Sequence, residues 1–157
     1  MVKLYIESMK LKLKSQLEYR LSFILTFISQ IGVFFTYYFM TVALFQRFDN
    51  IKGFTLYEVL ICFSIIHFGF AFNETFFRGI DKFDKFIIDG SLDRLLVRPR
   101  GILYQVICSD MDFVKAARII QSLIVFYIAI SHLNIEWNII NILLIIAMFL
   151  SSIILFF

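Results

Sequence analysis

The sequence predicts an all-α membrane protein, with an N-terminal amphipathic interfacial helix followed by four transmembrane helices. Three observations predict this class. Of the 157 residues, 61% are hydrophobic, whereas soluble domains average about 45–50%. Long stretches carry no charged residue, and only one proline and six glycines interrupt the chain. This composition excludes a disordered chain and a small disulfide scaffold. It also argues against a soluble enzyme, because one small core cannot hide so much apolar surface.

Residues 1–20 predict the interfacial helix. Apolar side chains recur there at helical spacing, and a charged residue follows each of them. The apolar residues are Val2, Ile6, Met9, Leu13 and Leu17, and the charged ones are Lys3, Glu7, Lys10, Lys14 and Glu18. A basic amphipathic helix beside a membrane span lies flat among the lipid headgroups. The alternative is that residues 1–20 extend the first span into the cytosol.

Four apolar segments predict the spans of a single transmembrane domain covering 1–157, at about 21–45, 54–77, 113–135 and 138–157. The first is uncharged from Leu21 to Phe45, roughly 37 Å of helix against a hydrocarbon core of about 30 Å. It is too long for a secretory signal, and no cleavage site follows it. The second span reaches full length only if Glu58 and Glu74 lie near the two interfaces.

The basic residues predict the orientation. All but two of the 15 Lys and Arg residues lie in the N-terminal segment or in the 78–118 connection. Because positive charge accumulates on the cytoplasmic side of a membrane, the N-terminus and this connection are predicted to be cytoplasmic. The sequence ends at Leu155-Phe156-Phe157 with no Lys or Arg after Glu136. We therefore expect a product truncated after the fourth span.

The 78–118 connection predicts short amphipathic helices at the membrane surface. Ile80, Phe83, Phe86 and Ile87 share one helical face, and Gly90 is suited to a left-handed cap that ends this helix. Leucines then repeat at helical spacing as far as the breaker Pro99. Ser109 and Asp112 have the spacing of a capping box. Such helices need a second surface, so we expect a docking element for a cytosolic partner. The alternative is a loop that folds back on its own bundle.

Polar residues in the second span are candidates for lining a path: His67, Asn73 and Glu74. Ionisable groups within a bilayer are costly unless they are paired or hydrated, and they often mark a route for cargo. The alternative for His67 is a hydrogen bond between helices. The small-residue pairs Gly32–Thr36 and Ala147–Ser151 would let helices approach closely.

Several absences limit the function. No glycine begins a phosphate-binding loop, so this chain is not expected to hydrolyse ATP. No catalytic or metal-ligand motif occurs, and we expect no metal and no cofactor in this chain. The basic residues lie where topology puts them, so nucleic acid is not an expected partner. Cys62 and Cys108 fall in different segments and predict no disulfide.

The chain resembles the permease subunits of bacterial ATP-binding-cassette exporters of type 2, over essentially its whole length. The order of parts is shared: a basic amphipathic helix, two spans and a cytoplasmic stretch. That stretch fits a G-x-L-D-x-x-L-x-R-P pattern through Gly90, Leu92, Asp93, Leu96, Arg98 and Pro99. Members of the family have about six spans, so this sequence matches the first four.

The resemblance implies two permease subunits, identical or different, above two cytosolic ATP-binding-cassette ATPase subunits, in a bacterial plasma (inner) membrane. It implies a coupling helix within 80–93 that meets the ATPase. The implied contact residues are Asp81, Phe83, Asp84, Phe86, Asp89, Gly90, Leu92, Asp93, Arg98 and Pro99. Two alternatives remain at this stage: a small oligomeric proton-coupled carrier or pore, and a non-transporting membrane assembly partner.

Overall fold

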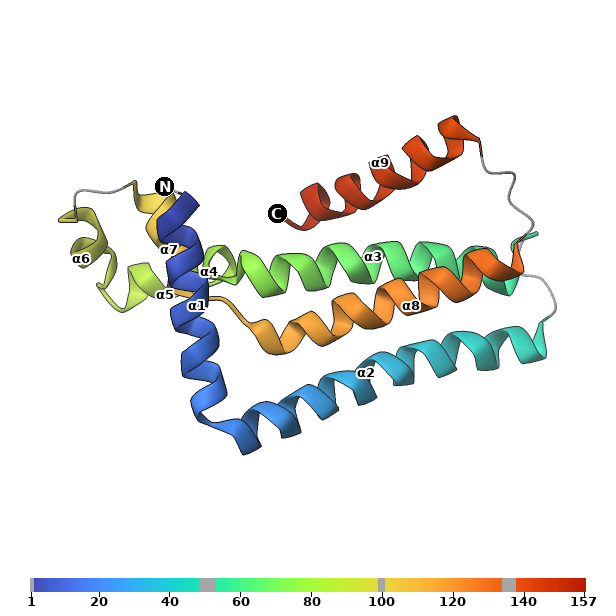
Figure 1. The fold of residues 1–157 in the computed structure, drawn as a ribbon, viewed down its shortest axis with the longest axis horizontal. Coiled ribbons are helices and arrows are strands. Elements are labelled where there is room, and N and C mark those ends of the chain that lie inside the picture. Colours follow the sequence, from blue (N-terminus) through green and yellow to red (C-terminus); the bar gives the residue numbers. More distant parts are fainter. Residues whose placement is uncertain (1, 49–52, 99–100, 134–137) are drawn as a thin grey trace.

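The computed structural model describes residues 2–48, 53–98, 101–133 and 138–157. Within these ranges the elements are helices, with no strand. Four of the helical segments are long and apolar enough to cross a membrane, so the predicted class is confirmed for the described part of the chain. Figure 1 shows these spans along the bundle, with α1 and the shorter helices α4–α7 gathered at one end.

An elbow separates the N-terminal helix from the first span. α1 (Val2–Glu18) lies across the end of the bundle, whereas α2 (Arg20–Arg47) runs along it (Figure 1). The chain turns at Tyr19, whose backbone angles (φ −94°, ψ 65°) are not helical. Ile6, Leu13 and Leu17 of the predicted apolar stripe stay exposed on α1. This stripe is therefore available to lipid, as the interfacial interpretation expects.

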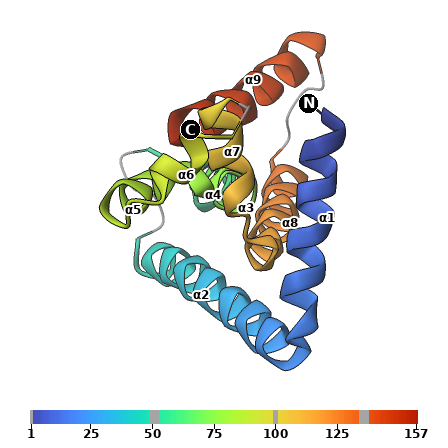
Figure 2. The same cartoon turned by 90° about the vertical axis from the view of Figure 1, so that its left-hand side faces the viewer.

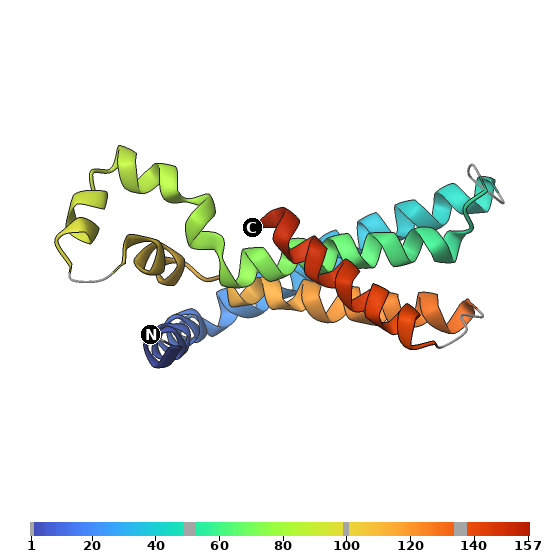
Figure 3. The same cartoon turned by 90° about the horizontal axis from the view of Figure 1, so that it is seen from above.

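The four spans alternate in direction along the bundle. They are α2, α3 (Leu56–Phe76), the 3₁₀ turn η1 (Phe113–Lys115) continuing into α8 (Ala116–His132), and α9 (Ile139–Phe156). α2 and α8 end, and α3 and α9 begin, at one end of the bundle, whereas α1 and α4–α7 lie at the other (Figures 1 and 3). This is the arrangement that four membrane crossings require.

The span ends differ slightly from the predicted limits. α3 begins two residues later than expected because Thr55 precedes it as a cap: the Thr55 N–H donates to Glu58 Oε2 at 2.8 Å. α8 ends at His132, and Leu133 is extended. The rest of the predicted third span, 134–135, lies outside the described residues, as does Glu136.

The core of the bundle lies around α3, which packs mainly on α8 and α9. Towards the end of the bundle where α3 begins, Phe34, Leu60, Val125 and Ala129 form one buried cluster. Small side chains are buried along α3 and α8, among them Ser64, Ala71, Thr75, Ala117 and Ser122. Small residues let helices in a membrane approach closely, because dispersion contacts grow as the backbones near one another.

A close approach between α3 and α9 involves Gly69 on α3. A Cβ atom there would lie 2.7 Å from the backbone of Ser152 on α9. The Ser152 hydroxyl donates to the Ile65 carbonyl at 2.9 Å, and the Asn73 amide donates to the Ile153 carbonyl at 2.8 Å. Gly69 thus lies between two hydrogen bonds that hold α9 on α3.

The small-residue pairs predicted from sequence do not provide this contact. A Cβ on Gly32 would meet nothing within 4 Å, and Ala147 and Ser151 are exposed. The pair prediction for close helix contacts is therefore wrong within this chain, because the small residues that matter, Gly69 and Ser152, come from different spans.

The described residues of the connection between α3 and α8 form four short helices that project beyond the spans (Figures 1 and 3). They are α4 (Arg78–Asp81), α5 (Phe83–Ile88), α6 (Leu92–Leu96) and α7 (Ile102–Ser109). Gly90 has φ +63°, which confirms the left-handed cap predicted there. Seen from this end, α1 and α5 lie on opposite sides of the bundle (Figure 2).

A close contact holds the two ends of this connection together. A Cβ on Gly79 of α4 would lie 2.9 Å from the carbonyl carbon of Val106 on α7, and would overlap its oxygen. Only glycine permits that approach. The α4–α7 contact therefore fixes where the projecting helices leave the bundle.

Candidate functional site

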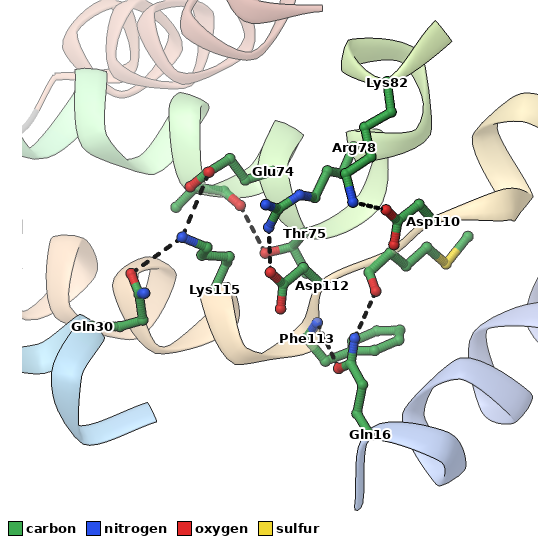
Figure 4. Close-up of polar contacts among 12 residues, drawn as sticks. Gln16, Gln30, Glu74, Thr75, Arg78, Lys82, Asp110, Asp112, Phe113 and Lys115 are labelled. Atoms are coloured by element: carbon green, nitrogen blue, oxygen red, sulfur yellow. Dashed lines mark hydrogen bonds and ion pairs between the residues drawn. The ribbon is translucent and has the colours of Figure 1, made fainter. Parts of the chain in front are cut away.

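A layer of charged side chains lies where α3 ends and α8 begins. We call it the charged layer. Its members come from α3, α4 and the residue that follows it, the segment 110–112, η1 and α8: Glu74, Arg78, Lys82, Asp110, Asp112, Lys115 and Arg118. Figure 4 shows most of them converging from separate elements.

Two ion pairs in the charged layer tie α4 to the segment before α8. Arg78 pairs with Asp112, and Lys82 pairs with Asp110 (Figure 4). The Asp112 N–H also donates to the Thr75 carbonyl at 3.2 Å. The two cations lie four residues apart, one helical turn, so both meet the acidic segment.

A third carboxylate joins α3 to the start of α8. Glu74 lies 2.9 Å from Arg118 Nη1 and 3.6 Å from Lys115 Nζ. Lys115 also donates to Gln30 Oε1 on α2 at 3.4 Å. All three charged side chains are less than one-fifth exposed. Three spans therefore meet at Glu74.

Helix α1 is attached to the same layer through one amide. The Gln16 side chain donates to the Met111 carbonyl at 2.8 Å and accepts from the Phe113 N–H at 3.1 Å (Figure 4). Further along α1, the Tyr5 hydroxyl donates to the Phe76 carbonyl at 3.4 Å. Burial, with a smaller effect from nearby Cys108, raises the pKa of Tyr5. α1 is thus bound to the end of the bundle along its length.

A cavity of about 360 Å³ opens between α2, α3 and α8. Its polar lining comprises His67, Glu74 and Arg118, and Phe34, Tyr37 and Phe70 supply aromatic walls. The His67 ring lies 4.2 Å from the Phe63 ring and 5.5 Å from the Phe34 ring, measured between centroids. We call this the polar pocket.

The structure brings together two of the three candidate path residues. His67 and Glu74 both line the polar pocket. Asn73 is buried on the side of α3 that faces α9, where its amide donates to the Ile153 carbonyl. Asn73 therefore makes a hydrogen bond between two helices. That is the role which the sequence analysis gave as the alternative for His67.

The predicted coupling residues that the structure describes lie on the projecting helices or in the turns that follow them. Most of them are exposed: Asp81, Phe83, Asp84, Asp89, Gly90, Asp93 and Arg98. Phe86 and Leu92 are half-buried, and Pro99 lies outside the described residues. Ile88 and Val97, which the prediction left out, are 79% and 85% exposed. The sequence could have indicated both, because Ile88 follows the apolar residues Phe86 and Ile87, and Val97 follows the repeated leucines.

Two local predictions in this region are wrong. The helix predicted to run from Ile80 to the cap at Gly90 is interrupted at Lys82, whose backbone is not helical (φ −101°, ψ 14°) and whose side chain pairs with Asp110. Ser109 and Asp112 form no capping box. The Ser109 hydroxyl donates back to the Val106 carbonyl at 2.6 Å, whereas Asp112 pairs with Arg78.

Sequence reasoning missed the charged layer as a unit. It counted Arg78, Lys82, Lys115 and Arg118 as topological charges only. The sequence did contain a signal: two cations one helical turn apart, Arg78 and Lys82, lie at the start of the connection, and two acids, Asp110 and Asp112, lie near its end. The described residues contain no group of three or more potential metal ligands.

These features define a multi-pass helical membrane protein with a projecting surface at one end of its bundle. Residues 31–157 match the family described as ABC-2 family transporter protein. The chain therefore belongs to the ABC-2 transporter family, a family of membrane transport components, which confirms the resemblance seen in the sequence. No match was found among curated proteins or among solved structures.

Proposed function

We propose that the chain is the permease subunit of an ATP-driven exporter, and that it couples to a separate cytosolic ATP-binding-cassette ATPase through α5 and α6. The observation that supports this most directly is the uncovered surface of these two helices. Neither contains a buried residue, and they stand away from the spans (Figure 3).

The chemistry of this surface suits a protein partner. Ile87, Ile88, Leu96 and Val97 are more than half exposed. Asp84, Asp89 and Asp93 lie among them, together with basic residues. An apolar patch rimmed by charges is typical of an interaction site. Outside the bilayer, such a patch is costly unless a partner covers it.

The substrate path requires a second permease subunit in this proposal, either a copy of this chain or a different one. α2 and α9 contribute few buried residues, namely Phe34, Phe45 and Ser152. Their apolar outer faces are therefore available to lipid and to a neighbouring subunit. The membrane proposed is the bacterial plasma membrane, with α1 and α4–α7 on its cytoplasmic side.

Co-purification tests the coupling. The tagged chain is extracted from its host in mild detergent, and an ATP-binding-cassette ATPase should be identified with it by mass spectrometry. Asp84→Lys with Ile88→Ala should remove that subunit, because both exposed side chains lie on one face of α5. The matched control is Glu7→Lys with Leu11→Ala, an exposed acid–apolar pair of the same spacing on α1. The proposal would be overturned if no ATPase co-purified with the unchanged chain, or if the two double variants recovered the ATPase in equal amounts.

A further inference from the structure

The charge balance beside the polar pocket is uneven. Glu74 faces two cations, Lys115 and Arg118. The other acids of the charged layer are already matched one to one, since Asp112 pairs with Arg78 and Asp110 with Lys82. Gln30, the further partner of Lys115, is uncharged. Within the described residues, one positive charge at this site has no carboxylate of its own.

That excess charge is placed where an anion would be held strongly. Both cations are at least four-fifths buried, and Arg118 itself lines the pocket. A buried charge without a counter-charge is costly in a region of low dielectric constant. His67, which also lines the pocket, is neutral or positive and supplies no anion. The site therefore favours a ligand that brings a negative charge.

The residues that line the pocket indicate the chemistry of the rest of the ligand. Phe34, Tyr37 and Phe70 offer aromatic surface. Glu74 lies seven residues after His67 on α3, which is about 10 Å along a helix. The cavity of about 360 Å³ is within the range of small-molecule sites. Of these wall residues, Tyr37 and Phe70 are partly exposed. A bound molecule would thus have an anionic end near Arg118 and an apolar part towards His67.

We propose that the polar pocket binds an amphiphilic anion, whose phosphate or carboxylate pairs with Arg118 while its apolar part lies against Phe34, Tyr37 and Phe70; Lys115, outside the pocket, keeps Glu74 neutralised. Assigning this molecule as cargo rests on the proposed transport function. Binding itself does not, because every contact comes from this chain.

A binding assay with the purified full chain in neutral detergent tests the site. The probe is a dansyl-labelled undecanoate, whose fluorescence rises in an apolar site. Decyl phosphate should displace it, whereas decyltrimethylammonium, with the same tail and a positive head, should not. Inorganic phosphate alone should displace it weakly. Equal displacement by the two amphiphiles would overturn the anion preference, and equal displacement by inorganic phosphate would overturn the apolar half of the site.

Variants locate the binding. Arg118→Gln should lower the affinity for the probe about tenfold, which is the effect expected from the loss of one charged hydrogen bond. It leaves Glu74 and Lys115 as a one-to-one pair, so the fold should persist. Arg78→Gln is the matched control, since Arg78 lies in the same layer but outside the pocket, and it should leave the affinity unchanged. Tyr37→Ala, at a half-exposed position, tests the wall with little cost to folding and should also weaken binding. Equal affinities for the unchanged chain, Arg118→Gln and Tyr37→Ala would refute the site.

Two further arms separate the sources of the anion. Phosphatidylglycerol that co-purifies with the chain and excludes the probe would identify the occupant as a bilayer lipid, and would overturn the cargo assignment. Displacement of the probe in phosphatidylglycerol-free preparations, with no lipid recovered, supports a cargo site. The assay needs no ATPase, so failure of the co-purification experiment leaves its result unaffected.

Discussion

Glu74 has more contacts between spans than any other carboxylate in the described part of the chain. It compensates Lys115 and Arg118 at the junction of α3 and α8. Glu74→Gln would leave both cations without a counter-charge in a largely buried place. Breaking a buried ion pair in this way costs about 3–5 kcal/mol. We expect a clear fall in the thermal unfolding temperature of the detergent-solubilised chain.

The double variant Glu74→Gln with Arg118→Gln distinguishes charge from packing. It removes one cation together with the carboxylate and should recover part of the lost stability. Two single losses that simply add would show that Glu74 and Arg118 act independently, contrary to the 2.9 Å contact between them.

A second prediction for a single residue concerns the steric packing of Gly69 against α9. A methyl group there collides with the backbone of Ser152, so Gly69→Ala should separate α9 from α3 and destabilise the chain by about 1–3 kcal/mol. Gly32→Ala is the matched control, because its methyl group enters open space and alanine is the better helix former. The two variants are compared by their thermal unfolding temperatures in detergent. A Gly69→Ala variant as stable as Gly32→Ala would contradict the close packing of α3 and α9.

At the scale of elements, the amide of Gln16 gives α1 two hydrogen bonds to the segment before α8. Gln16→Ala removes two hydrogen bonds, about 0.5–1.5 kcal/mol each, and should let α1 leave the bundle more often. Cys108 reports this opening, because its thiol lies beside Tyr5 and Ser8 of α1. In a Cys62→Ser background, alkylation of Cys108 should become about tenfold faster, and Ser15→Ala, at an exposed α1 position, should leave it unchanged. Equal rates in both variants would show that Gln16 does not hold α1.

The elements that the sequence predicted are those specified by local pattern. The spans follow from uncharged runs, the elbow from the change at 19–21, and the cap at Gly90 from the conformational freedom of glycine. What could not be predicted depends on contacts between distant segments. The kink at Lys82 accompanies an ion pair with the distant Asp110, and the buried role of Asn73 depends on α9 lying alongside. A single sequence does not show which segments meet.

At the scale of the whole molecule, the charged layer connects the projecting helices to the spans. α4 continues from α3 and is tied to the 110–112 segment by Arg78 and Lys82. That segment leads into α8 and is bound by Gln16 of α1. A displacement of α5 and α6 by a partner would thus reach α1, α3 and α8 through direct contacts. This is a physical connection between sites, and coupling along it requires two stable arrangements of the layer.

The orientation of the whole chain is the last prediction. The excess of Lys and Arg at the end that carries α1 and α4–α7 predicts that this end is cytoplasmic. In a background without native cysteines, made by Cys62→Ser and Cys108→Ser, Asp84→Cys places a thiol on α5 and Phe48→Cys places one at the opposite end; both positions are exposed. A membrane-impermeant maleimide applied to sealed cells should label Phe48→Cys and spare Asp84→Cys, which should react only after the cells are opened. Labelling of Asp84→Cys from outside would reverse the topology, and the surface proposed to meet the ATPase would then face away from the cytosol, where ATP is available.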